Sequence, residues 1–236
     1  MKNNFFEKYA GVLVNYSTKV KEDDLVLIKL ESYLAEPLAK EIYRAVIKNG
    51  AHPIVRCSVD GLNEIFLKNA NDNQLNYIDP ISKLEFNTVD AIISIGAPLN
   101  VKALSNVDSS KMAKRSGATR ELSQTMLKRA EKGELNWVIA DFPTQALAQE
   151  AKMSLDEYFE FVEKACYLDL DDPVSKWLEI GKEQKRIAEI LNGTKKLHIV
   201  GNKTDIVFNV ENRKWISCDG LNNFPDGEIF TSPVKD

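Results

Sequence analysis

The residues best suited to chemistry lie in the segment Trp215–Pro233, which carries the carboxylates Asp219, Asp226 and Glu228 among two glycines and two prolines. Glycine and proline at this density predict well-defined turns, and the sequence Glu228–Thr231 that follows them predicts a strand. A carboxylate at the point where a rigid turn enters a strand has its position fixed before anything binds, which suits a metal ligand. The alternative is a polar turn on the surface.

Other carboxylates have structural explanations or a weaker claim to a site. Asp141 ends a strand predicted at 136–142, and the carboxyl ends of parallel strands commonly host ligands, so Asp141 is a second candidate. Asp172 precedes a proline and predicts a helix cap. Asp169 and Asp171 add negative charge near the same helix start.

Cysteine and histidine restrict the chemistry further. Cys218 lies beside Asp219, and a neighbouring anion raises a thiol pKa, so we interpret Cys218 as structural and not as a nucleophile. The chain has only two histidines, His52 and His198, which excludes a multi-histidine zinc site built from one copy. We interpret His198 as a strand residue and His52 as a solvated turn residue.

Composition excludes several classes of protein. The 236 residues are 44% hydrophobic and carry a formal net charge of -4, which is ordinary for a globular protein and does not favour nucleic acid binding. There is no apolar run of membrane-spanning length and no signal peptide pattern, so we expect no membrane partner. Three cysteines without a C-x-x-C pair favour a reducing cytoplasm. The turn Gly96-Ala97-Pro98 lacks the glycine pattern of a dinucleotide site.

Strand and helix patterns alternate over the first part of the chain, which predicts an α/β fold. We expect a doubly wound, largely parallel sheet with helices on both faces. The predicted strands are 25–30, 53–59, 90–97 and 136–142. The predicted helices include 1–20, 34–48, 105–116, 119–132, 144–152, 154–166 and a long one from Pro173 to Asn192.

The pattern changes after Gly193, where short strands predicted at 197–200, 206–210 and 214–217 follow one another without helices. Such strands pair antiparallel, so we expect a short β-meander that begins a second domain. The predicted domains are 1–193 and 194–236. Because the second part is too small for an independent core, we expect it to be the start of a larger, truncated domain.

The segment Asn223–Pro233, with the sequence NFPDGEIFTSP, resembles a motif of the thermophilic metallo-aminopeptidases, the aminopeptidase T and aminopeptidase S group. Residues elsewhere also fit that family. They are Tyr9-Ala10, Leu13-Val14, Ala45, Gly50-Ala51, Asp171-Asp172-Pro173, Trp177, Gly201, Thr204-Asp205-Ile206, Trp215 and Asp219-Gly220.

The resemblance implies an exopeptidase that uses two divalent metal ions, of zinc, cobalt or magnesium type, to remove N-terminal residues from peptides. It implies that Glu228 is a metal ligand, that the other ligands of the family lie further downstream, and that the protein is a homodimer. We therefore expect this chain to be inactive alone and to hold no metal firmly. Two alternatives are a binding or assembly module without catalysis and a nucleotide-binding protein.

Overall fold

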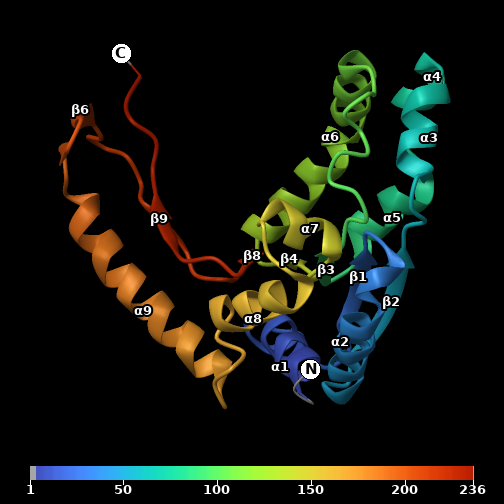
Figure 1. The fold of residues 1–236 in the computed structure, drawn as a ribbon, viewed down its shortest axis with the longest axis horizontal. Helices are drawn as coiled ribbons and strands as arrows, with labels where there is room; N and C mark the ends of the chain where they lie inside the picture. Colours follow the sequence, from blue (N-terminus) through green and yellow to red (C-terminus); the bar gives the residue numbers. More distant parts are fainter. Residues whose placement is uncertain (1–3, 236) are drawn as a thin grey trace.

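A computed structural model of the chain describes residues 4–235. Its centre is a five-stranded sheet in the order β2-β1-β3-β4-β8, in which every neighbouring pair is parallel (Figure 1). The predicted α/β class and the largely parallel sheet are therefore confirmed. The strands are β1 (Leu25–Leu30), β2 (His52–Cys57), β3 (Ala91–Gly96), β4 (Asn136–Asp141) and β8 (Asn223–Phe224).

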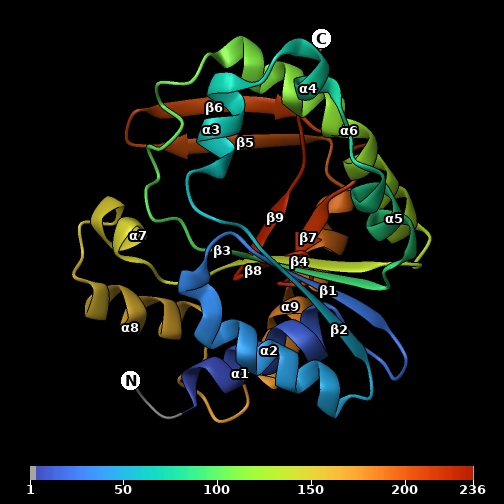
Figure 2. The same ribbon diagram turned by 90° about the vertical axis from the view of Figure 1, so that its right-hand side faces the viewer.

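Helices cover both faces of this sheet, as predicted, because alternate strand residues point to opposite faces. On β1, Val26, Ile28 and Leu30 enter the larger core, whereas Leu27 enters a second core on the other face. Figure 2 shows the sheet nearly edge on, with α1 and α2 below it and α5 and α6 above it. The larger core is covered by α1 (Phe5–Gly11), the π-helix Val12–Ser17, α2 (Glu36–Lys48), α8 (Leu155–Ala165) and α9 (Pro173–Asn192).

The second face is covered by α5 (Pro80–Thr88) and by α6 (Ser109–Glu131). The remaining elements are a 3-10 turn at Tyr33–Ala35, α3 (Leu62–Asn69), α4 (Asp72–Asn76) and α7 (Gln145–Glu150). Among residues 4–235, no helix is both long enough and apolar enough to cross a lipid bilayer.

The predicted pair of helices at 105–116 and 119–132 is wrong, because α6 is one continuous helix through Gly117. A single glycine inside a helix costs only about 1 kcal/mol. Two arginines fasten α6 on either side of that glycine: Arg115 donates to the carbonyl of Tyr77 at 2.6 Å, and Arg129 donates to the carbonyl of Val89 at 2.7 Å.

Helix α9 is confirmed from Pro173 to Asn192, with Asp172 as its cap. Trp177 is 1% exposed, whereas the next residue, Leu178, is 59% exposed. The polar Gln184 is buried instead, because its side chain accepts a hydrogen bond from Ser217 at 3.2 Å and donates one to the Glu228 carbonyl at 3.2 Å.

The residues after α9 form two small antiparallel sheets. One joins β5 (Lys196–Gly201) to β6 (Thr204–Asn209), and the other joins β7 (Ile216–Cys218) to β9 (Glu228–Phe230). The predicted antiparallel pairing is confirmed, although β7 pairs with β9 and not with β6. Figure 1 shows β6 at the far end of α9, away from the parallel sheet. Because β8 pairs with β4, part of this segment packs on the first sheet; the predicted domain boundary after residue 193 stays a prediction.

Candidate metal site

The turn that carries Glu228 is fastened to the core at its start. Phe224 is buried, pairs with Ala140 across β8 and β4, and packs against two other aromatic rings. Its ring centroid lies 5.6 Å from that of Tyr9 and 5.0 Å from that of Trp177. Since an aromatic side chain buries a large area, Phe224 fixes the point at which the chain leaves the sheet.

The end of the turn is fixed by Gly227 and by β9. Gly227 has a φ of +146°, a conformation that favours glycine, and its N–H donates to the Asp226 carboxylate at 3.0 Å. Glu228 then pairs with Cys218 across β9 and β7, and the Glu228 carbonyl accepts the hydrogen bond from Gln184 on α9. The predicted rigid turn that leads into a strand is present.

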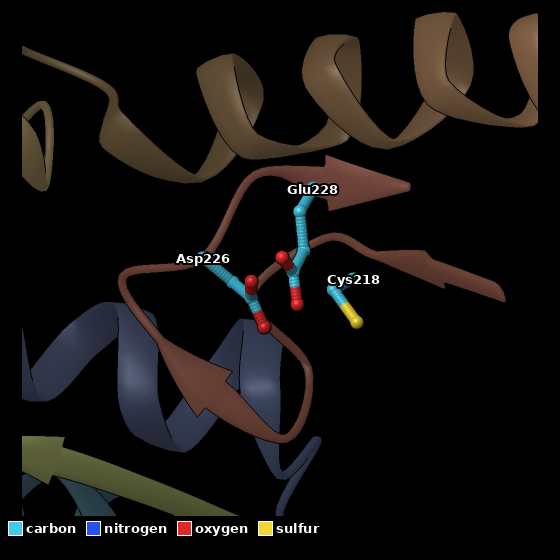
Figure 3. A group of neighbouring side chains, drawn as sticks. All are labelled: Cys218, Asp226 and Glu228. Carbon is cyan, nitrogen blue, oxygen red and sulfur yellow. The ribbon is translucent and has the colours of Figure 1, made fainter. Parts of the chain in front are cut away.

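The fastened turn brings three possible metal ligands together. Cys218, Asp226 and Glu228 each offer one ligand atom, and these three atoms all lie within 4.8 Å of one another. Figure 3 shows the carboxylates of Asp226 and Glu228 pointing toward each other, with the Cys218 sulfur beside them. Glu228 is exposed and the other two residues are half-buried, so an ion has access from solvent.

Negative charge gathers at this cluster. Burial raises the pKa of the Cys218 thiol, and the charges of Asp226, Glu228 and Asp219 raise it further. This is the direction predicted from the neighbouring Asp219. A divalent cation would relieve the repulsion between the carboxylates. Two carboxylate oxygens and one sulfur suit zinc or cobalt better than magnesium, which prefers oxygen ligands.

The cluster fits one cation and not two. A tetrahedral zinc site takes four ligands, of which a catalytic site draws three from protein and one from water. Within residues 4–235 this is the one group of three or more acidic, cysteine or histidine side chains close enough to share an ion. A second cation would need ligands from outside this group.

The second candidate of the sequence, Asp141, lies elsewhere. Its carboxylate lies at the carboxyl end of the parallel sheet beside Gly96 and near Glu31, whose own side chain accepts a hydrogen bond from the Ala97 N–H at 2.7 Å. Burial raises the pKa of Asp141, and the charge of Glu31 raises it further. Asp141 is not a member of the metal-ligand group.

The histidines and the remaining aspartates also lie outside that group. His198 on β5 contacts Asp205 at 2.7 Å, and His52 at the start of β2 lies 3.6 Å from Asp23. The Asp172 carboxylate caps α9 by accepting a hydrogen bond from the Ser175 N–H at 3.0 Å. Asp169 and Asp171 are exposed. The buried Asp219 lines a separate pocket on the α9 side.

Comparison with known proteins identifies the family. A sequence model described as thermophilic metalloprotease (M29) matches residues 2–236. The chain belongs to this family. The fold of this M29 chain is also similar to the solved structure of wild-type AmpT from Thermus thermophilus, with a TM-score of 0.79 at 18% sequence identity. The similarity covers 99% of this chain and 62% of the AmpT chain. None of the curated proteins compared with the M29 chain matches it.

The sequence alone predicted one of the three clustered residues of the M29 chain to be a metal ligand. Glu228 was predicted from the family motif. Asp226, two positions earlier in the same motif, was noted only as a nearby carboxylate. Cys218 was interpreted as structural, because only the pairing of β7 with β9 places it opposite Glu228. The alternation of side chains along two paired strands is the signal that would have found it.

Proposed function

We propose that this chain is part of a metal-dependent aminopeptidase and that Glu228 is one of its metal ligands, with Asp226 and Cys218 beside it. The observation that carries the proposal is the convergence of these three side chains on one fastened turn, in a chain of a metalloprotease family. In the dinuclear site that we propose for the whole enzyme, divalent cations activate a water molecule and polarise the scissile carbonyl of a peptide.

The residues of this chain hold part of that site. Glu228 and Asp226 supply negatively charged oxygens. Because the turn is already fixed, these oxygens need little rearrangement when a cation binds. Because the cluster supplies ligands for one cation, we propose that the 236-residue chain binds metal weakly and does not hydrolyse peptides by itself. Two cations held rigidly require further carboxylate or imidazole ligands.

The setting that we propose for the enzyme follows from the same family. Peptides with a free N-terminus are its substrates, and it is a homodimer. The three cysteines of the chain are free, which favours the reducing cytoplasm as its location.

Zinc binding tests the proposal. Titration calorimetry of the 236-residue chain is expected to show one zinc ion bound. The substitution Glu228→Gln keeps the shape but removes the charge, and it is expected to weaken binding by about tenfold or more. Glu211→Gln is the matched control, because Glu211 is an exposed glutamate in the turn after β6, lies outside the metal-ligand group and pairs with Lys195 at 2.9 Å. Equal zinc affinity of wild type and E228Q would refute the assignment.

The inactivity of the chain needs a separate assay. With saturating zinc or cobalt, the chain is expected to release no p-nitroaniline from leucine p-nitroanilide. Metal-dependent release that E228Q abolishes and E211Q leaves intact would contradict the proposed inactivity, while supporting Glu228 as a ligand.

A further inference from the structure

A pocket of about 800 Å³ lies along α9, separate from the metal-ligand group. One wall is α9 itself, including Leu178 and Gly181, and another is formed by Tyr16 and Lys19. Asp219 and Leu221 also line the pocket.

Asp219 is the unusual residue of this pocket. It is only 8% exposed. Its backbone carbonyl accepts a hydrogen bond from the Tyr16 hydroxyl at 2.7 Å, but within residues 4–235 its carboxylate has no hydrogen bond or ion pair. Its oxygens are not among the fully buried side-chain atoms that lack a hydrogen-bond partner, so the carboxylate reaches solvent through the pocket. A mostly buried charge of this kind favours a partner of opposite charge. The pocket is the open side from which a partner can come.

The fold holds this carboxylate in place. A Cβ atom on Gly181 would lie 2.9 Å from Asp219 Oδ2, so only glycine lets the carboxylate rest against α9. The next residue, Gly220, has a φ of +85°, and a Cβ there would lie 3.1 Å from the Trp177 ring. Ser17 donates a hydrogen bond to the Gly220 carbonyl at 2.7 Å. Asp219 is therefore fixed at the pocket by its neighbours.

The rest of the lining defines the chemistry of the partner. Glu183 and Arg186 pair with each other at 2.7 Å, and Glu179 pairs with Lys176 at 2.8 Å. Within residues 4–235, three lysines of the lining are in no ion pair, and neither is the one remaining acid of the lining, Glu189. The three lysines are Lys19, Lys182 and Lys185. Leu178 and Leu221 add apolar surface. The pocket thus offers a buried anion, unpaired cations at its wall and an apolar contact.

We propose that this pocket binds an amino acid with an apolar side chain, whose ammonium group pairs with Asp219 and whose carboxylate faces the lysines. Leu178 and Leu221 contact its side chain. The volume accommodates a molecule of that size with water. The inference concerns binding only and does not rest on the proposed peptidase activity.

Leucine is the probe, and the chain is measured with a chelator present, so that metal binding and hydrolysis do not contribute. Calorimetry is expected to detect leucine binding and a rise in melting temperature with leucine concentration. N-acetylleucine lacks the ammonium group and leucinamide lacks the carboxylate. Each is expected to bind about tenfold or more weakly, because each loses a charge-assisted hydrogen bond.

The substitution Asp219→Asn is expected to abolish most of this binding, again by about tenfold or more. It is expected to melt at or above the wild-type temperature, because it removes an unpaired buried charge. Glu211→Gln is the matched control: it changes the net charge equally, but Glu211 lies outside the pocket lining and its carboxylate is already paired with Lys195. E211Q is expected to bind leucine as the wild type does.

Absence of leucine binding to the wild type at millimolar concentration would overturn the proposal. The proposal would also be overturned if N-acetylleucine or leucinamide bound to the wild type as tightly as leucine, or if D219N bound leucine as tightly as the wild type does. If D219N does not fold, the affinities of the wild-type chain for leucine and for its two derivatives still test the proposal. Loss of zinc binding in E228Q, by contrast, says nothing about this pocket, so the two proposals fail independently.

Discussion

At the scale of single residues, the candidate metal site depends on side chains that are held before an ion arrives. Phe224 and Gly227 fix the two ends of the turn, and Glu228 follows directly in β9. Cys218 lies in β7, directly opposite Glu228 in β9. The pairing of these two strands, and not closeness in sequence, brings the sulfur to the candidate site. Burial and three nearby carboxylates raise the pKa of its thiol.

The three cysteines are expected to react with iodoacetamide in a defined order. The thiolate is the reactive form, and a raised pKa lowers its fraction at neutral pH. The exposed Cys57 is expected to react first and Cys218 more slowly. Cys166 is expected to stay unmodified, because burial raises the pKa of its thiol to about 12. Raising the pH is expected to accelerate Cys218, because the thiolate fraction grows as the pH approaches its raised pKa.

Mass spectrometry of peptides after timed labelling measures this order. Zinc is expected to protect Cys218 and to leave the rate at Cys57 unchanged, which serves as the internal control. Labelling of Cys218 that is faster than that of Cys57, or unaffected by zinc, would contradict the described cluster.

At the scale of elements, two glycines have opposite roles. Gly117 lies inside α6, and a Cβ there would meet nothing within 4 Å. Gly220 lies in the turn between β7 and β8 at a φ of +85°, beside Trp177. The first is tolerated because Arg115 and Arg129 fasten the helix; the second is required by the backbone.

Alanine substitutions at these two positions are therefore expected to change stability in opposite directions. Gly117→Ala is expected to stabilise the chain by roughly 0.5–1 kcal/mol, because alanine is the better helix former. Gly220→Ala is expected to destabilise it by about 1–2 kcal/mol or more, because the left-handed conformation is strained for alanine. Urea unfolding of both variants measures the difference. A stabilised G220A would show that the turn is not built as described.

These two glycines also show how far local sequence reasoning reaches. The break predicted between residues 116 and 119, where Gly117 lies, does not exist. The arginine contacts that hold α6 join residues about forty positions apart and leave no local signal. The cap of α9 was predicted correctly: Asp172 could be identified because a cap and the first turn of its helix are neighbours in sequence. The rigid turn before Glu228 was predictable from glycine and proline; the position of Cys218 was not.

At the scale of the whole molecule, helices cover both faces of the parallel sheet, whereas the hairpin of β5 and β6 leaves apolar side chains exposed. Strands β5 and β6 form a two-stranded sheet at the far end of α9, with Val200 68% and Val207 56% exposed. A two-stranded sheet with exposed apolar residues is marginal alone and offers free edges for pairing. The alternation of strands and helices predicted the sheet, but not that β8 returns to it from beyond β7.

This hairpin is expected to take part in self-association. Analytical ultracentrifugation of the chain is expected to show a dimer at high concentration. Val207→Lys is expected to shift it toward the monomer, because a charge on an apolar contact surface opposes burial. Asn202→Lys, in the turn of the same hairpin, adds the same charge away from the strands and is the control. A wild-type chain that stays monomeric at high concentration would count against the proposed homodimer.

The central claim is that Glu228 is a metal ligand on a preformed turn. Anomalous diffraction from crystals of this chain soaked in zinc tests it most directly. The account predicts an anomalous peak within about 2.0–2.2 Å of a Glu228 carboxylate oxygen, with Asp226 and Cys218 beside it. Zinc bound elsewhere, with Glu228 turned away from it, would contradict the account.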